Sequence, residues 1–321
     1  MFISTFQYIR FFFTGDWSLA KSTILEIQGN AMLYSSTRGN APARSLRELL
    51  SRGTAEDGGL YVPEAWPELS PGDLTALSGR PYDQIASDVL ALFGGAEWQQ
   101  GDFTAGIRHV LAGFERNDGP PLTRLNDQLW SMELFHGPTL AFKDYALAPL
   151  AEAIDRELSI TGKRATVLCA TSGDTGAATA NAFAGRSRAN AVILFPEGRV
   201  SDVQRKQMTC LGAANVQAIS VRGDFDDCQS IVKSLYQSEA AEKYSYTAVN
   251  SINLARILLQ TSYYIYASAK IHNDCGQPVN FAVPSGNFGN IFAGYIAKQM
   301  GAPIGKLIVT SNENDVLPRL F

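Results

Sequence analysis

The sequence predicts an α/β protein with a doubly wound, mainly parallel sheet and a mostly helical N-terminal region. After Pro121, short apolar runs of strand character alternate with helical stretches, which is typical of parallel sheets covered by helices. Before Pro121, apolar residues recur mainly at helical spacing. Apolar residues make up 45% of the 321 residues and charged residues 18%, which supports a sizeable core and excludes global disorder.

The N-terminal region contains short helices and one extended segment. Helical spacing is found at residues 45–50 and 75–77, and residues 82–93 place their apolar side chains on one stripe. Residues 57–63, with the letters DGGLYVP, predict a turn that leads into a short extended segment. The aromatic-rich residues 1–31 are a poor fit to a signal peptide, and we interpret them as an extension of unclear origin.

Strands and helices alternate in the second part of the chain. The expected strands are Leu129–Phe135, Thr166–Cys169, Ala191–Phe195, Val216–Val221, Val279–Val283 and Lys306–Thr310. The expected helices include Asp144–Glu157, Gly176–Phe183, Asp226–Tyr236 and Ile291–Met300. We therefore divide the chain into the extension (1–31), an N-terminal domain (32–121) and an α/β domain (122–321). The last domain stops shortly after its final strand, so we expect it to be incomplete at its C-terminal end.

Charge and residue usage argue against several classes of function. Lysine and arginine number 27 against 31 aspartate and glutamate, a net charge of −4, so we expect no nucleic-acid partner. No apolar run is long enough to span a bilayer, so we expect no membrane partner. The four cysteines lie far apart with no CxxC pair, which predicts a reducing, cytoplasmic location. The three histidines form no HExxH pattern, so we expect no metal site.

Two glycine-containing loops follow predicted strands and precede helices, at residues 171–176 (TSGDTG) and 284–290 (PSGNFGN). In open α/β sheets, ligands bind at such loops, where backbone N–H groups and a helix N-terminus favour an anion. The sequence contains no GxG, no GxSxG and no phosphate loop of nucleotide hydrolases, which argues against dinucleotides, nucleoside triphosphates and a hydrolase elbow. A small phosphorylated ligand remains as one interpretation, and two ordinary strand-to-helix turns as the other.

One lysine, Lys143, lies in the segment 136–145 (HGPTLAFKDY), directly before a predicted helix. Apolar neighbours and the positive helix end both disfavour its ammonium form. A lysine with a lowered pKa can act as a Schiff-base nucleophile, whereas most lysines at helix starts are solvated surface residues. Both interpretations are open at this point.

Taken together, these segments resemble threonine synthases, which are pyridoxal-phosphate enzymes of the tryptophan-synthase-β-like fold type II. The resemblance runs from about Met32 to the end of the chain. The matching segments are 36–39 (STRG), 57–63 (DGGLYVP), 135–144 (FHGPTLAFKD), 171–176 (TSGDTG), 202–208 (DVQRKQM), 250–253 (NSIN), 286–290 (GNFGN) and 312–316 (NENDV). The set is specific, since related dehydratases and sulfhydrylases of this fold differ around the lysine and in the phosphate loop.

The resemblance implies a lyase of threonine biosynthesis, which converts O-phosphohomoserine and water to L-threonine and phosphate. It implies that Lys143 holds pyridoxal 5′-phosphate as an internal aldimine and moves protons once the substrate has displaced it. The domain at 32–121 is then the threonine-synthase-like N-terminal domain, and the domain at 122–321 is the cofactor-binding catalytic domain. The cofactor phosphate is expected on the backbone amides of Gly286, Asn287, Phe288, Gly289 and Asn290.

Substrate contacts are expected from two segments of the chain. Arg256 and Asn253 share one face of a helix, so they can converge on the phosphate of the substrate; a structural ion pair is the alternative for Arg256. His136 is either catalytic or a hydrogen-bonded residue that orients the turn before Lys143. The residues expected to hold the substrate carboxylate, or to lie against the cofactor ring, are Ser172, Gly173, Asp174 and Thr175.

Other functions stay open at the level of the sequence. The same cofactor would serve a phospho-lyase or dehydratase that acts on a related amino acid. An inactive fragment is a third interpretation, because threonine synthases of this type usually continue further and supply a hydroxyl partner for the pyridine nitrogen from that later segment. We expect a monomer or homodimer with a small-molecule substrate.

Overall fold

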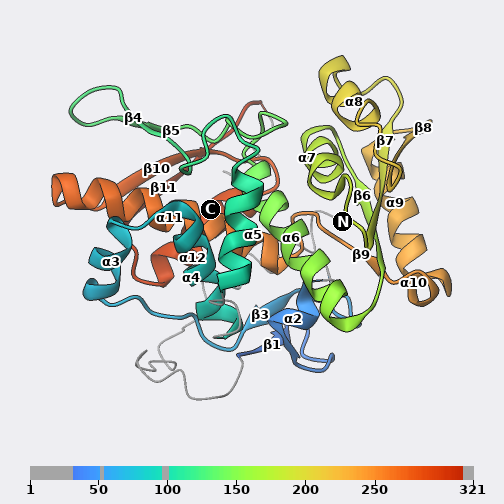
Figure 1. Cartoon of the computed structure of the whole chain (residues 1–321), viewed down its shortest axis with the longest axis horizontal. Coiled ribbons are helices and arrows are strands. Elements are labelled where there is room, and N and C mark those ends of the chain that lie inside the picture. Colours follow the sequence, from blue (N-terminus) through green and yellow to red (C-terminus); the bar gives the residue numbers. More distant parts are fainter. Residues whose placement is uncertain (1–31, 51–53, 96–100, 314–321) are drawn as a thin grey trace.

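The computed structural model describes residues 32–50, 54–95 and 101–313 (Figure 1). The extension at 1–31 and residues 314–316 of the last family segment lie outside the described residues. In the described chain, parallel strands are covered by helices, and the predicted α/β class is confirmed.

A four-stranded parallel sheet has the strand order β8-β7-β6-β9. Its strands are β6 (Ala165–Ala170), β7 (Ala189–Pro196), β8 (Val216–Val221) and β9 (Tyr246–Thr247). Successive residues of a strand face opposite sides of the sheet. Ile193 therefore packs on the side of α7 (Asp174–Phe183) and α8 (Asp202–Thr209), whereas Leu194 packs against α9 (Phe225–Tyr236).

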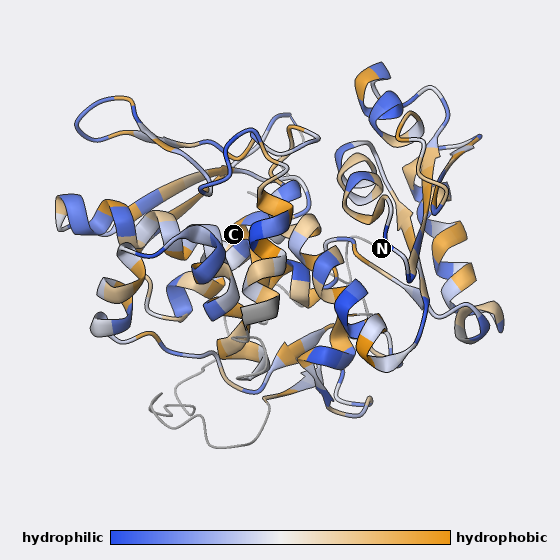
Figure 2. Ribbon diagram, in the orientation of Figure 1, coloured by the Kyte–Doolittle hydropathy of each residue, from blue (hydrophilic) through white to orange (hydrophobic). Residues whose placement is uncertain are grey.

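The two central strands, β6 and β7, are mainly apolar in Figure 2, because helices cover both of their faces. The short helix α10 (Ala240–Lys243) connects α9 to β9 (Figure 1). The doubly wound arrangement predicted for this part of the chain is thus present.

The larger part of the core surrounds α11 (Leu254–Cys275), in which every residue from Leu254 to Ala269 is buried. A helix that is buried on all sides belongs inside a core. The helices packed on α11 are α3 (Pro71–Ser78), α4 (Tyr82–Gly94), α6 (Asp144–Thr161) and α12 (Gly289–Gln299), and α5 (Gly101–Leu111) packs on α4 and α6. A second parallel pair, β10 (Val279–Pro284) and β11 (Ile304–Thr310), is joined through α12.

One hydrophobic cluster spans the predicted domain boundary at residue 121. Tyr34 and Phe93 belong to the same cluster as Leu258 and Ile296. The Tyr34 hydroxyl also donates a hydrogen bond to the Phe93 carbonyl oxygen at 2.7 Å. The N-terminal region therefore packs directly on the helices of the α/β part, and the division into domains stays a prediction.

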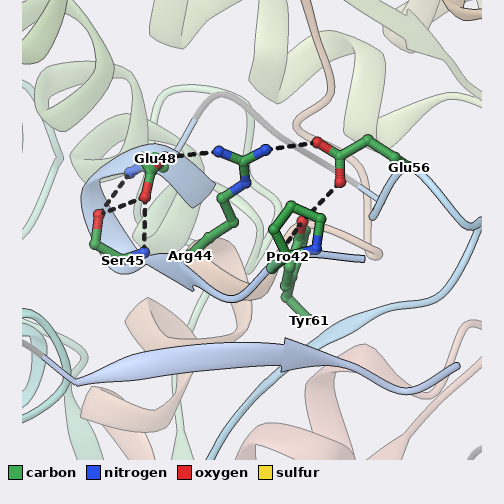
Figure 3. Close-up of polar contacts among 6 residues, drawn as sticks. All are labelled: Pro42, Arg44, Ser45, Glu48, Glu56 and Tyr61. Atoms are coloured by element: carbon green, nitrogen blue, oxygen red, sulfur yellow. Dashed lines mark hydrogen bonds and ion pairs between the residues drawn. The ribbon is translucent and has the colours of Figure 1, made fainter. Parts of the chain in front are cut away.

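The N-terminal segment forms a small antiparallel sheet from β1 (Leu33–Ser36), β2 (Arg44–Ser45) and β3 (Tyr61–Pro63). Arg44 of β2 forms ion pairs with two glutamates outside this sheet. Its guanidinium lies 3.0 Å from Glu48 of α2 (Leu46–Leu49) and 2.8 Å from Glu56 (Figure 3). Tyr61 donates to the second Glu56 oxygen at 3.1 Å. The predicted turn into an extended segment at 57–63 is confirmed, with β3 as its extended part.

The strand expected at Leu129–Phe135 is shorter than predicted and differently paired. β5 (Trp130–Met132) forms an antiparallel hairpin with β4 (Leu122–Arg124) and joins neither parallel sheet. The connection from β4 to β5 is too short for the crossover that parallel pairing requires. The sequence prediction placed a helix at Asn253 and Arg256 but gave no bounds for α11, because a helix buried on all sides has no one-sided apolar stripe. The other predicted strands are confirmed.

Two isoleucines of α6 test this packing, because Ile154 is 2% exposed and Ile160 is 59% exposed. Replacing Ile154 by Ala should lower the free energy of unfolding by about 2–5 kcal/mol, since the change removes buried methyl groups and leaves a cavity. The matched control, Ile160→Ala, should change it by less than about 0.5 kcal/mol. Urea unfolding followed by circular dichroism measures both values, and equal losses would contradict the described orientation of α6.

Candidate active site

Lys143 lies at the N-terminal end of α6, directly before Asp144. Its side chain is 15% exposed, and its Nζ atom lies 2.9 Å from Asp174 Oδ2 and 4.4 Å from the centre of the Phe142 ring. Burial lowers the pKa of Lys143 from its usual value, and the Asp174 carboxylate opposes part of this shift. The amine is therefore covered, paired with an acid and easier to deprotonate than a surface lysine.

The turn before Lys143 is held by Asp144. The backbone N–H and the hydroxyl of Thr139 donate to the two carboxylate oxygens of Asp144, at 2.8 and 2.7 Å. Gly137 passes so close that a Cβ there would lie 2.5 Å from Asp144 Cβ, which requires glycine. Leu140 has a φ of 60°, a left-handed value that is rare for leucine. These contacts keep the lysine segment in one conformation.

The first glycine loop leads from β6 into α7 and is closed by Thr171. The Thr171 hydroxyl oxygen accepts hydrogen bonds from the amides of Gly173 at 3.0 Å and Gly176 at 2.8 Å. Asp174, the first residue of α7, accepts Lys143 on one carboxylate oxygen and Gln204 Nε2 on the other, at 2.6 Å.

The ionised form of Asp174 is stabilised by these two neighbours. Burial acts to raise the pKa of Asp174, but the charge of Lys143 and the hydrogen bonds from Lys143 and Gln204 keep it below its usual value. An ionised Asp174 in turn stabilises the Lys143 ammonium. The two residues therefore act as one unit.

The second glycine loop leads from β10 into α12, which begins at Gly289. Among the described residues, the backbone N–H groups of Gly286 and Asn287 have no hydrogen-bond partner, and neither has the buried hydroxyl of Ser285. A Cβ on Gly286 would meet nothing within 4 Å. Donors without partners, open space and a helix N-terminus together make this loop suitable for an anion.

The guanidinium of Arg256 is buried on α11, at 3% exposure of the residue. Its Nη1 donates to the Val249 carbonyl oxygen at 3.2 Å, and its Nε has no partner within the described part of the chain. Burial lowers the pKa of Arg256 to about 10, so the group is still cationic at neutral pH. A buried cation without an acidic partner is costly, and an anionic ligand would relieve that cost.

A cavity of about 320 Å³ brings these groups together from distant parts of the chain. Its wall also contains Gln204, Ser251 and Gln260. The predicted site residues on its wall are Lys143, Ser172, Asp174, Thr175, Arg256, Gly286, Asn287, Phe288, Gly289 and Asn290. The lysine segment and both glycine loops therefore face one space, as the resemblance implied.

Two predicted ligand contacts are absent from the described wall of the cavity. A Cβ on Gly173 would lie 2.4 Å from the Gln204 side-chain amide, so this glycine faces α8. Asn253 is fully buried as the N-cap of α11, where its side chain donates to Leu50 O at 3.1 Å and to Ala248 O at 2.8 Å. The backbone therefore engages the Asn253 amide, and the contact of Asn253 with the substrate phosphate stays a prediction.

His136 is also absent from the described wall of the cavity. Its Nδ1 lies 3.0 Å from Glu115 Oε2 and its Nε2 lies 2.8 Å from Glu133 Oε2. Hydrogen bonds to Glu133 and Glu115 raise the pKa of His136 above its usual value. Of the two roles predicted for this residue, the structure favours the one that orients the turn before Lys143.

Sequence reasoning missed Ser285 and Gln204 as residues of the site. A hydroxyl next to Gly286 in an anion-binding loop is a signal that could have identified Ser285. Gln204 lies in the family segment 202–208, but its sequence signal is that of a helix cap with Ser201. Nothing local connects Gln204 to Asp174.

The residues of the cavity fit pyridoxal phosphate. The amides of Gly286 and Asn287 and the Ser285 hydroxyl lack partners among the described residues and suit a phosphate group. Lys143, which is covered and has a lowered pKa, suits an aldehyde. The Nε donor of the buried Arg256, which has no partner among the described residues, suits a second anion.

Comparisons with known proteins define the class to which this site belongs. Residues 120–321 match the family profile described as pyridoxal-phosphate dependent enzyme, and residues 33–110 match the profile described as threonine synthase N terminus. The chain belongs to the family of pyridoxal-phosphate dependent enzymes, and the cofactor predicted from the sequence is confirmed as that of the family.

Within this family the chain is similar to threonine synthases. It is 42% identical over 294 residues to the threonine synthase of Pseudomonas aeruginosa, which covers 90% of this chain and 62% of that protein. The crystal structure of PLP-bound threonine synthase from Brucella melitensis superposes with a TM-score of 0.84 at 46% identity, over 90% of this chain and 62% of that chain. The crystal structure of threonine synthase from yeast superposes with a TM-score of 0.83 at 39% identity, over 91% of this chain and 60% of that chain.

The resemblance to threonine synthases and their fold is therefore confirmed. The chain spans about three-fifths of the length of these relatives. Among the described helices, none is long and apolar enough to cross a membrane. The four cysteines are free, with Cys169 and Cys228 buried.

The pairing of His136 with two carboxylates predicts a pH-dependent stability. The folded-state pKa of His136 lies above the unfolded value of 6.5, so the stabilisation is fully present below pH 6.5 and is lost as the pH rises through the folded pKa. His136→Gln should abolish this part of the pH dependence. Urea midpoints measured between pH 6 and pH 9 test it, and identical profiles for the two proteins would contradict the described contacts.

Proposed function

We propose that this chain carries the active site of a threonine synthase, which converts O-phosphohomoserine and water to L-threonine and phosphate. The cavity shared by Lys143, the two glycine loops and the buried Arg256 is the observation that carries the proposal. Similarity to threonine synthases over 90% of the chain supports this reaction over others of the family.

The cofactor is proposed to lie between the second glycine loop and Lys143. Bound pyridoxal phosphate supplies an electron sink for the carbon skeleton of the substrate. Lys143 binds the aldehyde side of the cofactor and, once released, takes up and returns protons at Nζ, a task that its lowered pKa favours. The residues proposed to hold the cofactor phosphate are Gly286, Asn287, Phe288, Gly289 and Asn290, with the Ser285 hydroxyl as a further donor.

Ser172 and Thr175 are proposed to bind the substrate carboxylate. Both line the cavity beside the N-terminal end of α7, where the helix dipole favours a negative charge. Asp174 lies between them, but its carboxylate is engaged by Lys143 and Gln204. It therefore acts on the substrate through Lys143.

Arg256 is proposed to bind the phosphate that leaves the substrate. The net charge of −4 repels a phosphorylated substrate, so a local cation is needed to capture it. Guanidinium binds phosphate through paired N–H donors, and the Nε atom of Arg256 has no partner among the described residues. This arrangement would keep the substrate phosphate apart from the cofactor phosphate.

The remaining features of the proposal come from the sequence and the relatives. Residues 32–121 are assigned as the N-terminal domain and residues 122–321 as the cofactor-binding catalytic domain. The substrate is a small molecule, and the chain is proposed to act in the cytoplasm as a monomer or homodimer.

Lys143 should be the residue that binds the cofactor covalently. After incubation of the chain with pyridoxal phosphate and reduction with borohydride, peptide mass spectrometry should find the cofactor on Lys143, with Lys163 and Lys206 as internal controls. Lys143→Ala should remove the label. Labelling of Lys163 or Lys206 instead would contradict the assignment.

The loaded chain should release threonine and phosphate from O-phosphohomoserine, measured by amino-acid analysis and a phosphate assay. Release of 2-oxobutyrate in place of threonine would identify the phospho-lyase or dehydratase alternative.

The two phosphate sites should be separable by substitution. Arg256→Met should raise the Michaelis constant for O-phosphohomoserine about ten- to hundred-fold, as expected for the loss of a charge-assisted contact of about 1.5–3 kcal/mol, and should leave cofactor affinity unchanged. Gly289→Val should lower the affinity for pyridoxal phosphate and leave the Michaelis constant of the loaded chain for O-phosphohomoserine unchanged. A Cβ at Gly289 meets Ser251 Cβ at an ordinary 3.5 Å, so the fold tolerates it while the cofactor phosphate loses room. Normal cofactor affinity in the Gly289 variant would contradict the placement.

A further inference from the structure

Gln204 occupies the third position of α8, where it completes a capping box with Ser201. The Ser201 hydroxyl accepts the Gln204 N–H at 3.2 Å, and the Ser201 N–H donates to the Gln204 side-chain oxygen Oε1 at 3.0 Å. Because Oε1 is engaged by the backbone, the amide group has one orientation, with Nε2 directed away from the cap. The capping box at the N-terminal end of α8 therefore fixes the direction in which Gln204 Nε2 donates a hydrogen bond.

The donor of Gln204 reaches Asp174. Nε2 lies 2.6 Å from Asp174 Oδ1, and the other oxygen of the same carboxylate accepts Lys143 Nζ at 2.9 Å. Gln204, Asp174 and Lys143 all line the cavity. A continuous line of hydrogen bonds thus runs from the backbone of Ser201 to the amine of Lys143.

The first glycine loop leaves space for the side chain of Gln204, because it has a glycine at position 173. A Cβ on Gly173 would lie 2.4 Å from the side-chain amide of Gln204. Gly173 also has a φ of 144°, a value that side chains rarely adopt. The loop and α8 therefore approach each other at the point where the amide meets Asp174.

We propose that Gln204 is a positioning residue for Lys143, and that it acts by orienting the Asp174 carboxylate that holds the lysine amine. The inference deepens the proposed function and rests on it only for the task of Lys143. A carboxylate held on one oxygen by a fixed amide keeps its other oxygen directed at the ammonium group. Without the Gln204 amide, the Asp174 carboxylate loses the donor that fixes its orientation.

The charges around Lys143 give the sign of the expected effect. Burial and Arg256 lower the pKa of Lys143, whereas Asp174 and Asp144 raise it. Asp174 is the carboxylate in direct contact with Nζ. A poorly oriented Asp174 should therefore lower the pKa of Lys143 further and leave more of the amine uncharged.

The test is trace acetylation of the full chain, freed of any bound pyridoxal phosphate, with acetic anhydride over a range of pH. Peptide mass spectrometry then yields the pKa of each lysine. In Gln204→Met, which keeps the length of the side chain but has no amide, the pKa of Lys143 should fall by about half a unit or more. Lys163 and Lys206 should be unchanged. An unchanged Lys143 would overturn the proposal.

The matched control is Ser201→Ala, which removes the other half of the capping box and leaves the Gln204 amide beside Asp174. This variant should lower the urea midpoint without moving the pKa of Lys143. If it moves the pKa as far as Gln204→Met does, the role of Gln204 is only to cap α8, and the proposal is wrong.

Asp174→Asn gives a second line of evidence that does not depend on how well the Gln204 variant folds. It should lower the pKa of Lys143 at least as far as Gln204→Met, and the double variant should show no further change, because Gln204 acts through Asp174. An unchanged Lys143 in Asp174→Asn, or additive effects in the double variant, would overturn the proposal. Failure of borohydride labelling at Lys143 would instead remove the proposed function and leave these pKa values interpretable.

Discussion

The ion pair between Lys143 and Asp174 is the contact on which the rest of the site depends. Lys143 directly precedes α6, which belongs to the large core, and Asp174 is the first residue of α7, which covers the four-stranded sheet. Their contact at 2.9 Å joins the two helix starts, and the helices also pack on each other. A covered ammonium group needs an acidic partner, so the pair and the packing of the helices support each other.

The two cations of the cavity are treated differently by the fold. Lys143 has a carboxylate partner, whereas the buried guanidinium of Arg256 has a single hydrogen bond from Nη1 to a backbone carbonyl and an Nε without a partner in the described chain. A protein selected for stability alone would pair or replace such a group. The hydroxyl of Ser285 likewise has no hydrogen-bond partner among the described residues, so both groups are available to a ligand.

Local signals in the sequence were sufficient wherever one segment determines its own structure. The strand-to-helix loops at 171–176 and 284–290 and the lysine before α6 were found from glycine positions and apolar runs, and all three line the cavity. The sequence prediction was incomplete where burial or strand pairing decides which contacts a residue makes. Asn253 was expected to share a ligand-binding helix face with Arg256, but in the structure Asn253 caps the buried helix α11. β5 (Trp130–Met132), which is shorter than the strand expected at 129–135, pairs with β4, a partner that its own sequence pattern does not specify.

By itself, the sequence determined the class of fold, the order of most elements, and the positions of the two glycine loops and of Lys143 next to strands and helices, because spacing, glycine and turn chemistry act over a few residues. Only the tertiary structure decided which distant groups meet. Three features depend on how separate elements pack: the contact of Gln204 with Asp174, the two carboxylates around His136, and the lack of an acidic partner for Arg256 among the described residues. Distances between side chains of different elements follow from that packing, and no local pattern encodes them.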